Sequence, residues 1–410
     1  MEEPARLSFH GLLWVYIILV LCFILGFNPK RLYHGHNAQL EYFKFRNGKL
    51  EHQNYNSVRK SKKRNVTTEM CRKLNGCEYK MDIFRKSMVF FDQKLNSSLT
   101  RVKGKRFDMS PKIYKLMKTY LNSKTISSST RTEHPENIQP ITGLSSNHFS
   151  EFQKNINNAD KFFSNKKIVV YDIGLEPYQA FKFQGNLYQQ KFIYRKLDFD
   201  KYPDHVRELL TFSFKWACII EGLIEFGAVI WFDTSIVFPG DQYFEPLIKE
   251  KMEAKKNPAD ILFYVRPATH SIASATFKQM LDYIPSNIDN LAENHMMQAG
   301  AVMVYNTESL KQNVLKWAYF CILTKLCIAP EKLWNENGHV SELDKWCPKR
   351  ITNFKRELAH YRVYGADEIL FACHRGDQSM ISILVYNYYG TESVDRFVCK
   401  FAFVRRLMMN

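Results

Sequence analysis

From Lys166 onward, short runs of β-branched and aromatic residues alternate with longer stretches of helical periodicity. The runs that predict strands are Lys167–Asp172, Phe192–Tyr194, Ala228–Phe232, Ile261–Val265 and Gln298–Tyr305. The helical stretches follow Asp204 through Phe226, Glu308 through Leu326 and Asp377 through Tyr388. This alternation predicts an α/β domain with a mostly parallel sheet flanked by helices.

The positive charge lies before this domain. The 410 residues carry a formal net charge of +17, yet residues 168–410 hold 28 Lys and Arg against 28 Asp and Glu. Residues 28–167 hold 29 Lys and Arg against 11 Asp and Glu. The basic residues lie in runs such as 59–64, and aromatic residues do not alternate with them as they do on a nucleic-acid-binding face. We therefore expect no nucleic-acid partner, and interpret residues 28–165 as a basic stem and 166–410 as the catalytic domain.

Residues 11–27 contain no charged side chain and are just long enough to span a bilayer. A cleaved signal peptide is the alternative, but Glu2 and Glu3 precede the run and no small-residue cleavage site follows it. The pattern favours an uncleaved transmembrane signal anchor after a short cytoplasmic tail, residues 1–10.

The orientation of this anchor rests on opposing signals. Lys30 and Arg31 follow the span, which by the positive-inside rule favours a cytosolic C-terminal side. Two glycosylation sequons, at Asn65 and Asn96, and eight cysteines outside the span favour the lumen. We predict a single-pass type II protein of the Golgi or ER membrane with a lumenal C-terminal domain.

In open parallel sheets, ligands bind at the carboxyl ends of strands, so the residues directly after each predicted strand are candidates. Asp172 could accept hydrogen bonds from a ribose or base, with Gly174 allowing close backbone approach; a capped turn explains both residues equally well. Asp-x-Gly also permits an adenosylmethionine site, although the next residues, Leu175 to Pro177, are not the further glycines such a site needs.

Asp233 follows a fully apolar predicted strand. A carboxylate at the end of a buried strand needs a cation or several hydrogen-bond donors. A divalent metal bridging to a diphosphate would meet this need, because hard cations prefer oxygen ligands. Ser235, two residues later, could assist.

Two further segments carry candidates. Gln298 and Gly300 lie in a small-residue stretch that could face a sugar or simply allow tight packing. Asp377 opens the last predicted helix, where it could cap the helix or serve as an acid or base. His374 and Arg375 precede it, and could bind a metal or diphosphate and counter phosphate charge.

The order of these segments resembles that of GT-A glycosyltransferases, in which an acidic strand end, usually Asp-x-Asp, binds a metal. Here the corresponding residues are W-F-D-T-S at 231–235, Q-A-G-A-V at 298–302 and H-R-G-D-Q-S at 374–379. With the Y-D-I-G-L run at 171–175, the chain also resembles a nematode-expanded domain-of-unknown-function family of single-pass secretory proteins.

The GT-A resemblance implies a nucleotide-sugar donor, Mn²⁺ held by Asp233 and His374, and catalytic roles for Asp233 and Asp377. It implies donor binding by a set of residues from the same segments: Asp172, Gly174, Ser235, Gln298, Gly300 and Arg375. The expected protein is a Golgi type II glycosyltransferase acting on a glycan acceptor on protein, lipid or polysaccharide.

Two alternatives remain open. Because Ser235 stands where the motif usually has its second Asp, the fold could serve a non-catalytic, carbohydrate-binding protein. The second and weaker alternative is the methyltransferase suggested by Asp172 and Gly174.

Overall fold

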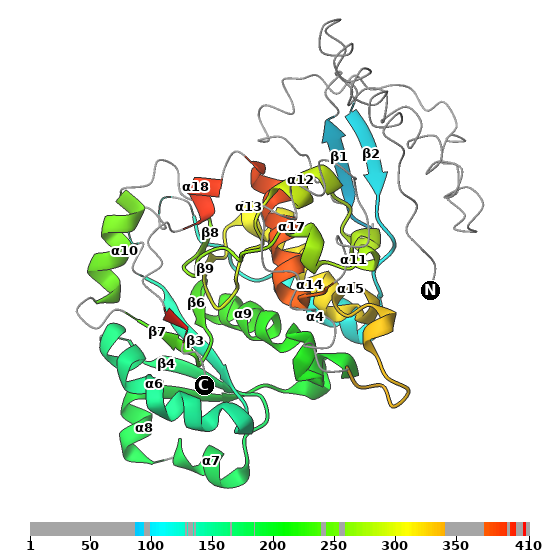
Figure 1. Ribbon diagram of the computed structural model, residues 1–410. Coiled ribbons are helices and arrows are strands. Elements are labelled where there is room, and N and C mark those ends of the chain that lie inside the picture. Colours follow the sequence, from blue (N-terminus) through cyan, green and yellow to red (C-terminus); the bar gives the residue numbers. More distant parts are fainter. Residues whose placement is uncertain are drawn as a thin grey trace, which may run out of the picture. The chain divides into compact units, whose positions relative to one another are not determined.

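The computed structural model describes residues 87–93, 99–127, 129, 134, 137–164, 166–183, 185–238, 243–253, 259–340, 373–391, 394–398 and 405–406. Its central sheet has six strands in the order β5-β4-β3-β6-β9-β8 (Figure 1). Their bounds are β3 Gln139–Leu144, β4 Ile168–Asp172, β5 Phe192–Lys196, β6 Ala228–Phe232, β8 Ile261–Phe263 and β9 Ala301–Tyr305. Strands β5, β4, β3 and β6 are parallel neighbours, and β9 runs antiparallel between β6 and β8. This confirms the prediction of an α/β domain with a mostly parallel sheet.

Helices flank the sheet (Figure 1). The α-helices are α4 Pro111–Leu121, α6 Phe149–Phe162, α7 Pro177–Lys182, α8 Asn186–Lys191, α9 Ser213–Phe226, α10 Phe244–Glu253, α11 Lys278–Tyr283, α12 Ile288–Glu293, α13 Glu308–Leu310, α14 Lys316–Leu323, α15 Lys325–Ile328, α17 Gly376–Tyr389 and α18 Val394–Phe397. Short 3₁₀ turns are η1 Ser146–His148, η2 Phe199–Lys201, η3 Asp204–Arg207, η4 Leu209–Thr211, η5 Ala273–Ala275 and η7 Glu331–Leu333, and η6, Lys311–Leu315, is π-helical. Two small antiparallel pairs are β1 Val89–Gln93 with β2 Leu99–Lys103, and β7 Ile236–Val237 with β10 Arg405–Arg406.

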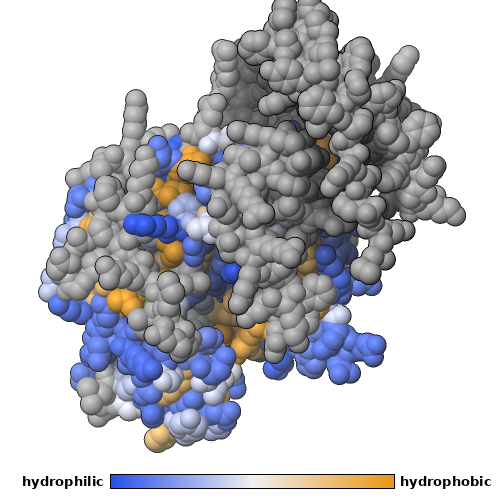
Figure 2. All heavy atoms as spheres, in the orientation of Figure 1, coloured by the Kyte–Doolittle hydropathy of each residue, from blue (hydrophilic) through white to orange (hydrophobic). Residues whose placement is uncertain are grey.

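The sheet is buried on both faces, as the continuous apolar sequence of β6 predicts. Successive side chains of a strand point to opposite faces. Val229 and Trp231 accordingly join the larger core, which also contains side chains of α9, α14 and α17. Ile230 and Phe232 join a second core formed with α6 and α10. The domain is therefore a three-layer α/β/α structure. On the face seen in Figure 2, hydrophobic side chains gather in separate patches among hydrophilic ones.

The central strand β3 lies inside the segment predicted to be a stem, so the folded domain begins before residue 166. Strand β3 pairs with β4 on one edge and with β6 on the other, and Thr142 Oγ1 donates to Phe232 O at 2.7 Å. Its sequence, QPITGL, looks like a linker because it contains Pro140 and Gly143. Pro140 stands at the beginning of the strand, where a sheet tolerates proline.

Several predicted elements have different bounds from those expected. The strand expected at 298–305 begins at Ala301, and the single helix expected at 308–326 is divided among α13, η6, α14 and α15. Gly227 ends α9 with a left-handed backbone (φ +76°) that glycine adopts without strain.

The predicted anchor at 11–27 and both glycosylation sequons lie outside the described residues. Within the described part of the chain, no helix combines the length and apolarity that crossing a membrane requires. A disulfide joins Cys321 to Cys327, and Cys218 is a free cysteine buried in the core.

The position of β3 predicts that a chain beginning at Lys166 will not fold. Without β3, the edges of β4 and β6 lose their hydrogen-bond partners and the two cores lose their middle layer. We expect the full-length chain to unfold cooperatively in circular dichroism, and residues 166–410 to show no such transition. A cooperative transition of the shorter chain would show that β3 is dispensable.

Candidate functional site

A cavity of about 420 Å³ opens at the carboxyl ends of the parallel strands. The chain adds β4 and β5 on one side of β3 and then returns to add β6 on its other side, so β3 and β6 form a topological switch point. Residues that follow three strands line the cavity: Ser145, Asn147 and His148 after β3, Ile173 after β4, and Asp233, Thr234 and Ser235 after β6. Phe212, Phe214 and Trp231 add aromatic walls. Open α/β sheets bind their ligands at such a crevice.

A buried lysine, Lys215, lies at the edge of this cavity. Its Nζ is 3.1 Å from Asp233 Oδ1, 3.1 Å from Asp377 Oδ2 and 3.2 Å from Ala299 O. An ammonium has three N–H donors, and three protein oxygens surround this one. Lys215 therefore links the three segments that the sequence analysis selected separately, around Asp233, Gly300 and Asp377.

The charges of this cluster depend on one another. Burial alone would lower the pKa of Lys215, but the two carboxylates outweigh it and hold that pKa above its ordinary value. Burial raises the pKa of Asp377, and the ammonium of Lys215 limits the rise. The ammonium of Lys215 lies 3.1 Å from the buried Oδ2 of Asp377, and this ion pair compensates for the burial of that oxygen.

The cluster requires α17 to approach the chain before α9 closely. A Cβ atom on Gly376 would lie 2.9 Å from Thr211 O, so only glycine fits at the start of α17. Phe212, which follows Thr211, has a left-handed backbone (φ +55°), a conformation that costs energy for a residue with a side chain. Strained residues of this kind gather at functional sites.

Of the predicted site residues, Asp233 and Ser235 line the cavity. Asp233 Oδ1 also accepts a hydrogen bond from Trp231 Nε1 at 2.9 Å, and its backbone N donates to Gly300 O at 2.8 Å. Gly300 thus fixes the backbone of Asp233 through this hydrogen bond. Asp377 has only 3% of its side chain exposed and is outside the lining, which does not favour direct contact with an acceptor.

Asp172 and Gly174 form a closed turn. Asp172 Oδ1 accepts from the backbone N of Gly174 at 2.9 Å and of Leu175 at 2.7 Å, and Oδ2 accepts from Tyr194 Oη at 2.6 Å. These bonds favour the capped-turn interpretation over ribose binding. They also argue against the methyltransferase, because the backbone N–H groups of Gly174 and Leu175 already donate to Asp172 and are not available to a bound cofactor.

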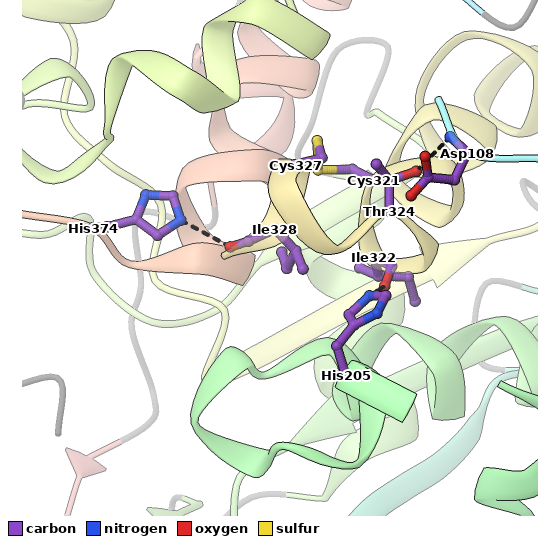
Figure 3. The surroundings of a disulfide bond; sticks show 8 residues. All are labelled: Asp108, His205, Cys321, Ile322, Thr324, Cys327, Ile328 and His374. Carbon is purple, nitrogen blue, oxygen red and sulfur yellow. Dashed lines mark hydrogen bonds between the residues drawn. A yellow bond between two sulfur atoms is a disulfide. The ribbon is translucent and has the colours of Figure 1, made fainter. Parts of the chain in front are cut away.

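His374 lies apart from Asp233, in a structural position. Its Nε2 donates to Ile328 O at 2.8 Å (Figure 3). Its Nδ1 accepts from Phe277 N at 3.2 Å, so both ring nitrogens are used. Burial lowers its pKa to about 4. The structure therefore contradicts a metal or diphosphate role for His374. Arg375 is exposed and Gln298 half-buried, and neither is among the cavity-lining residues.

The residues present do not fit a metal resident at Asp233. A lysine ammonium and an indole N–H already approach Oδ1, and the residue two positions later is Ser235. Among the described residues, no group of three or more His, Cys, Asp or Glu side chains could hold a metal ion.

Sequence reasoning missed Lys215, and also His148 and Glu151, which line the cavity after β3. A lysine within the apolar helix sequence SFKWACIIEGLIEF was the available signal for Lys215. No signal pointed to the other two, because their strand was taken for stem.

Comparison with known proteins gives a family match and distant structural likenesses. Residues 84–220 match the family described as "Protein of unknown function (DUF1647)". Among curated proteins, none matches the chain.

Among solved structures, galactosyltransferase LgtC in complex with donor and acceptor sugar analogs is similar with 9% identity and a TM-score of 0.26, over 43% of this chain and 61% of LgtC. The chain thus covers less than two thirds of LgtC. Mouse xyloside xylosyltransferase 1 in its apo form is similar with 12% identity and a TM-score of 0.35, over 63% of this chain and 83% of the xylosyltransferase. The mannosyltransferase Ktr4p from S. cerevisiae in complex with GDP is similar with 8% identity and a TM-score of 0.36, over 70% of this chain and 78% of Ktr4p. Similarity this distant says nothing about substrate or chemistry.

Replacing Lys215 with methionine should destabilise the protein strongly. Asp233 and Asp377 would lose the charge that compensates them, and breaking a buried ion pair from one side costs about 3–5 kcal/mol. Urea unfolding measures this loss, with the exposed Lys154→Met as control. Adding Asp377→Asn to Lys215→Met should recover part of the stability, and a Lys215→Met protein as stable as the wild type would contradict the proposed linkage.

The two buried histidines predict that stability falls in acid. His205 Nε2 donates to Ile322 O, and burial lowers its pKa to about 4, as for His374 (Figure 3). In the unfolded chain both titrate near 6.5, so their contribution is complete above about pH 6.5 and is lost as the pH falls toward 4. The expected slope is about 1.4 kcal/mol per pH unit for each histidine.

Urea unfolding between pH 7 and pH 5 tests this slope. His374→Gln replaces the ring with a neutral group that can still donate and accept, so its share of the slope should disappear. The same slope in His374→Gln and in the wild type would show that this histidine does not stay neutral in the folded state.

Proposed function

We propose that this protein is a glycosyltransferase that binds a nucleotide sugar in the cavity between β3 and β6. The observation that carries the proposal is the cavity at the switch point, with the carboxylate of Asp233 in its wall and a buried lysine holding that carboxylate in place. Such crevices bind nucleotides in open α/β sheets. The similar solved structures are sugar transferases, but they are too distant to support the proposal.

The lining is suited to sugars and nucleosides. The half-buried ring of Phe212 can stack on a base or sugar ring, and the hydroxyl, amide and carboxylate groups of the lining can bind ring hydroxyls. In the transfer, the bond from the anomeric carbon to the diphosphate oxygen breaks and a bond from that carbon to an acceptor hydroxyl oxygen forms. The leaving diphosphate keeps the electron pair of the broken bond and takes up the proton that the hydroxyl loses. Asp233 would accept hydrogen bonds from sugar hydroxyls, while Asp377 would act through Lys215 as a positioning residue.

The cellular setting belongs to the same proposal. We infer an anchor at 11–27 and a type II orientation in the Golgi or ER membrane, with a glycan acceptor on protein, lipid or polysaccharide. The Cys321–Cys327 disulfide supports an oxidising compartment. A stem would be shorter than 28–165, since β3 already belongs to the domain.

One observation favours a second candidate, a carbohydrate-binding protein without catalysis. The described lining contains two carboxylates, of Glu151 and Asp233, and one ammonium that protein oxygens surround. Such a lining suits neutral, polyhydroxylated ligands better than a free diphosphate.

Thermal shift with a panel of nucleotide sugars should identify the class. We expect the full-length chain, in mild detergent, to be stabilised by at least one nucleotide sugar, and Asp233→Asn to reduce that shift. Mn²⁺ alone should give no shift, because Lys215 already lies beside Asp233. Stabilisation by free glycans, with none by any nucleotide sugar, would favour the carbohydrate-binding protein.

A further inference from the structure

Glu151, in the first turn of α6, lines the same cavity with only 8% of its side chain exposed. Its Oε1 accepts a hydrogen bond from Thr234 Oγ1, and His148 Nδ1 lies 3.7 Å from the same oxygen. Its Oε2 is buried and has no hydrogen-bond partner among the described residues. A carboxylate in the wall of the cavity is thus only half satisfied.

The surrounding structure holds this carboxylate in place. Asn155, one turn further along α6, donates its Nδ2 to Thr234 O at 2.8 Å, so α6 and the end of β6 are joined at two points beside Glu151. A buried carboxylate oxygen without a donor is unfavourable, and native proteins keep few of them. Asp233, in the same lining, has its charge compensated by Lys215, whereas the contacts of Glu151 with the described residues are Thr234 and His148, neither of which carries an ammonium.

We propose that Glu151 Oε2 receives a hydroxyl or N–H group from an uncharged part of the ligand, and that this end of the cavity excludes phosphate. Two observations carry the proposal: Oε2 has no hydrogen-bond partner among the described residues, and Glu151 lies in the lining of the cavity. A phosphate would be repelled there, whereas a neutral donor would complete the hydrogen bonding of the carboxylate. The inference rests on the proposed function for its ligand, a nucleotide sugar.

The neutral donor group can come from the transferred sugar or from the nucleoside. The probes that separate these sources are UDP-glucose and GDP-mannose, compared with UDP and GDP. If the sugar supplies the group, loss of Glu151 lowers the affinity for UDP-glucose and GDP-mannose and leaves the affinity for UDP and GDP unchanged. If the nucleoside supplies the group, loss of Glu151 lowers the affinity for a nucleotide sugar and for the nucleoside diphosphate with the same base by a similar factor.

The test compares the full-length wild type with Glu151→Gln by titration calorimetry and thermal unfolding. We expect the affinity for the nucleotide sugar to fall tenfold or more in Glu151→Gln, since an amide replaces the charged acceptor. Without ligand, its Tm should equal or exceed that of the wild type, because an uncompensated buried charge is removed. Glu225→Gln is the matched control, because Glu225 pairs with Arg195 at 3.1 Å, is 44% exposed, and is not among the cavity-lining residues.

Thr234→Val provides a second variant, which removes the hydrogen bond that Thr234 donates to the carboxylate of Glu151 and leaves that carboxylate in place. We expect a lower Tm with binding retained. Unchanged affinity in Glu151→Gln would overturn the inference and leave the proposed function intact. If the wild type binds no probe, the proposed function fails and the Tm of Glu151→Gln decides: a lower value overturns the inference as well, and an equal or higher value supports a ligand-binding Glu151 in a site for another ligand.

Discussion

The ammonium of Lys215 holds together the carboxyl-terminal edge of the sheet. It lies on α9, and its contacts lie after β6, before β9 and at the start of α17. Burying a charged amine is unfavourable, and two carboxylates and a carbonyl compensate for it here. The same contacts fix the carboxylate of Asp233 beside the cavity, so the stability of the domain and the geometry of the site depend on one side chain.

Much of the sheet could be predicted from sequence, because parallel strands buried on both faces are continuous apolar runs. Ala228–Phe232 has the bounds expected of it. The sequence of β3 lacks this pattern: Pro140 and Gly143 lower its apparent strand propensity, and tertiary pairing on both edges overrides that preference. Because this strand is not predicted from sequence, neither are the polar residues after it that line the cavity: Ser145, Asn147, His148 and Glu151.

The site was harder to predict than the fold. Strand-end reasoning selected Asp233 because its burial demanded a cation, and the structure places a cation there, although it is Lys215 rather than a metal. No spacing rule connects positions 215, 233 and 377, since only the packing of α9 and α17 brings them together. For the same reason His374 was misjudged: its neighbours in sequence are site residues, whereas its ring packs against Phe277 and binds two backbone groups.

The two carboxylates of the cavity therefore differ in what they can do. The charge of Asp233 is compensated by Lys215, and Trp231 donates a hydrogen bond to the same oxygen. A ligand can therefore bind beside Asp233 without facing an unpaired negative charge. Glu151, in the first turn of α6, keeps a carboxylate oxygen that has no hydrogen-bond partner among the described residues. A ligand with one anionic and one neutral polar end would enter such a cavity in a single direction, with its neutral end toward α6, because the reverse placement would bring two negative groups together. This placement depends on α6 and the end of β6 being joined, because Asn155 and Glu151 on α6 both form hydrogen bonds with Thr234.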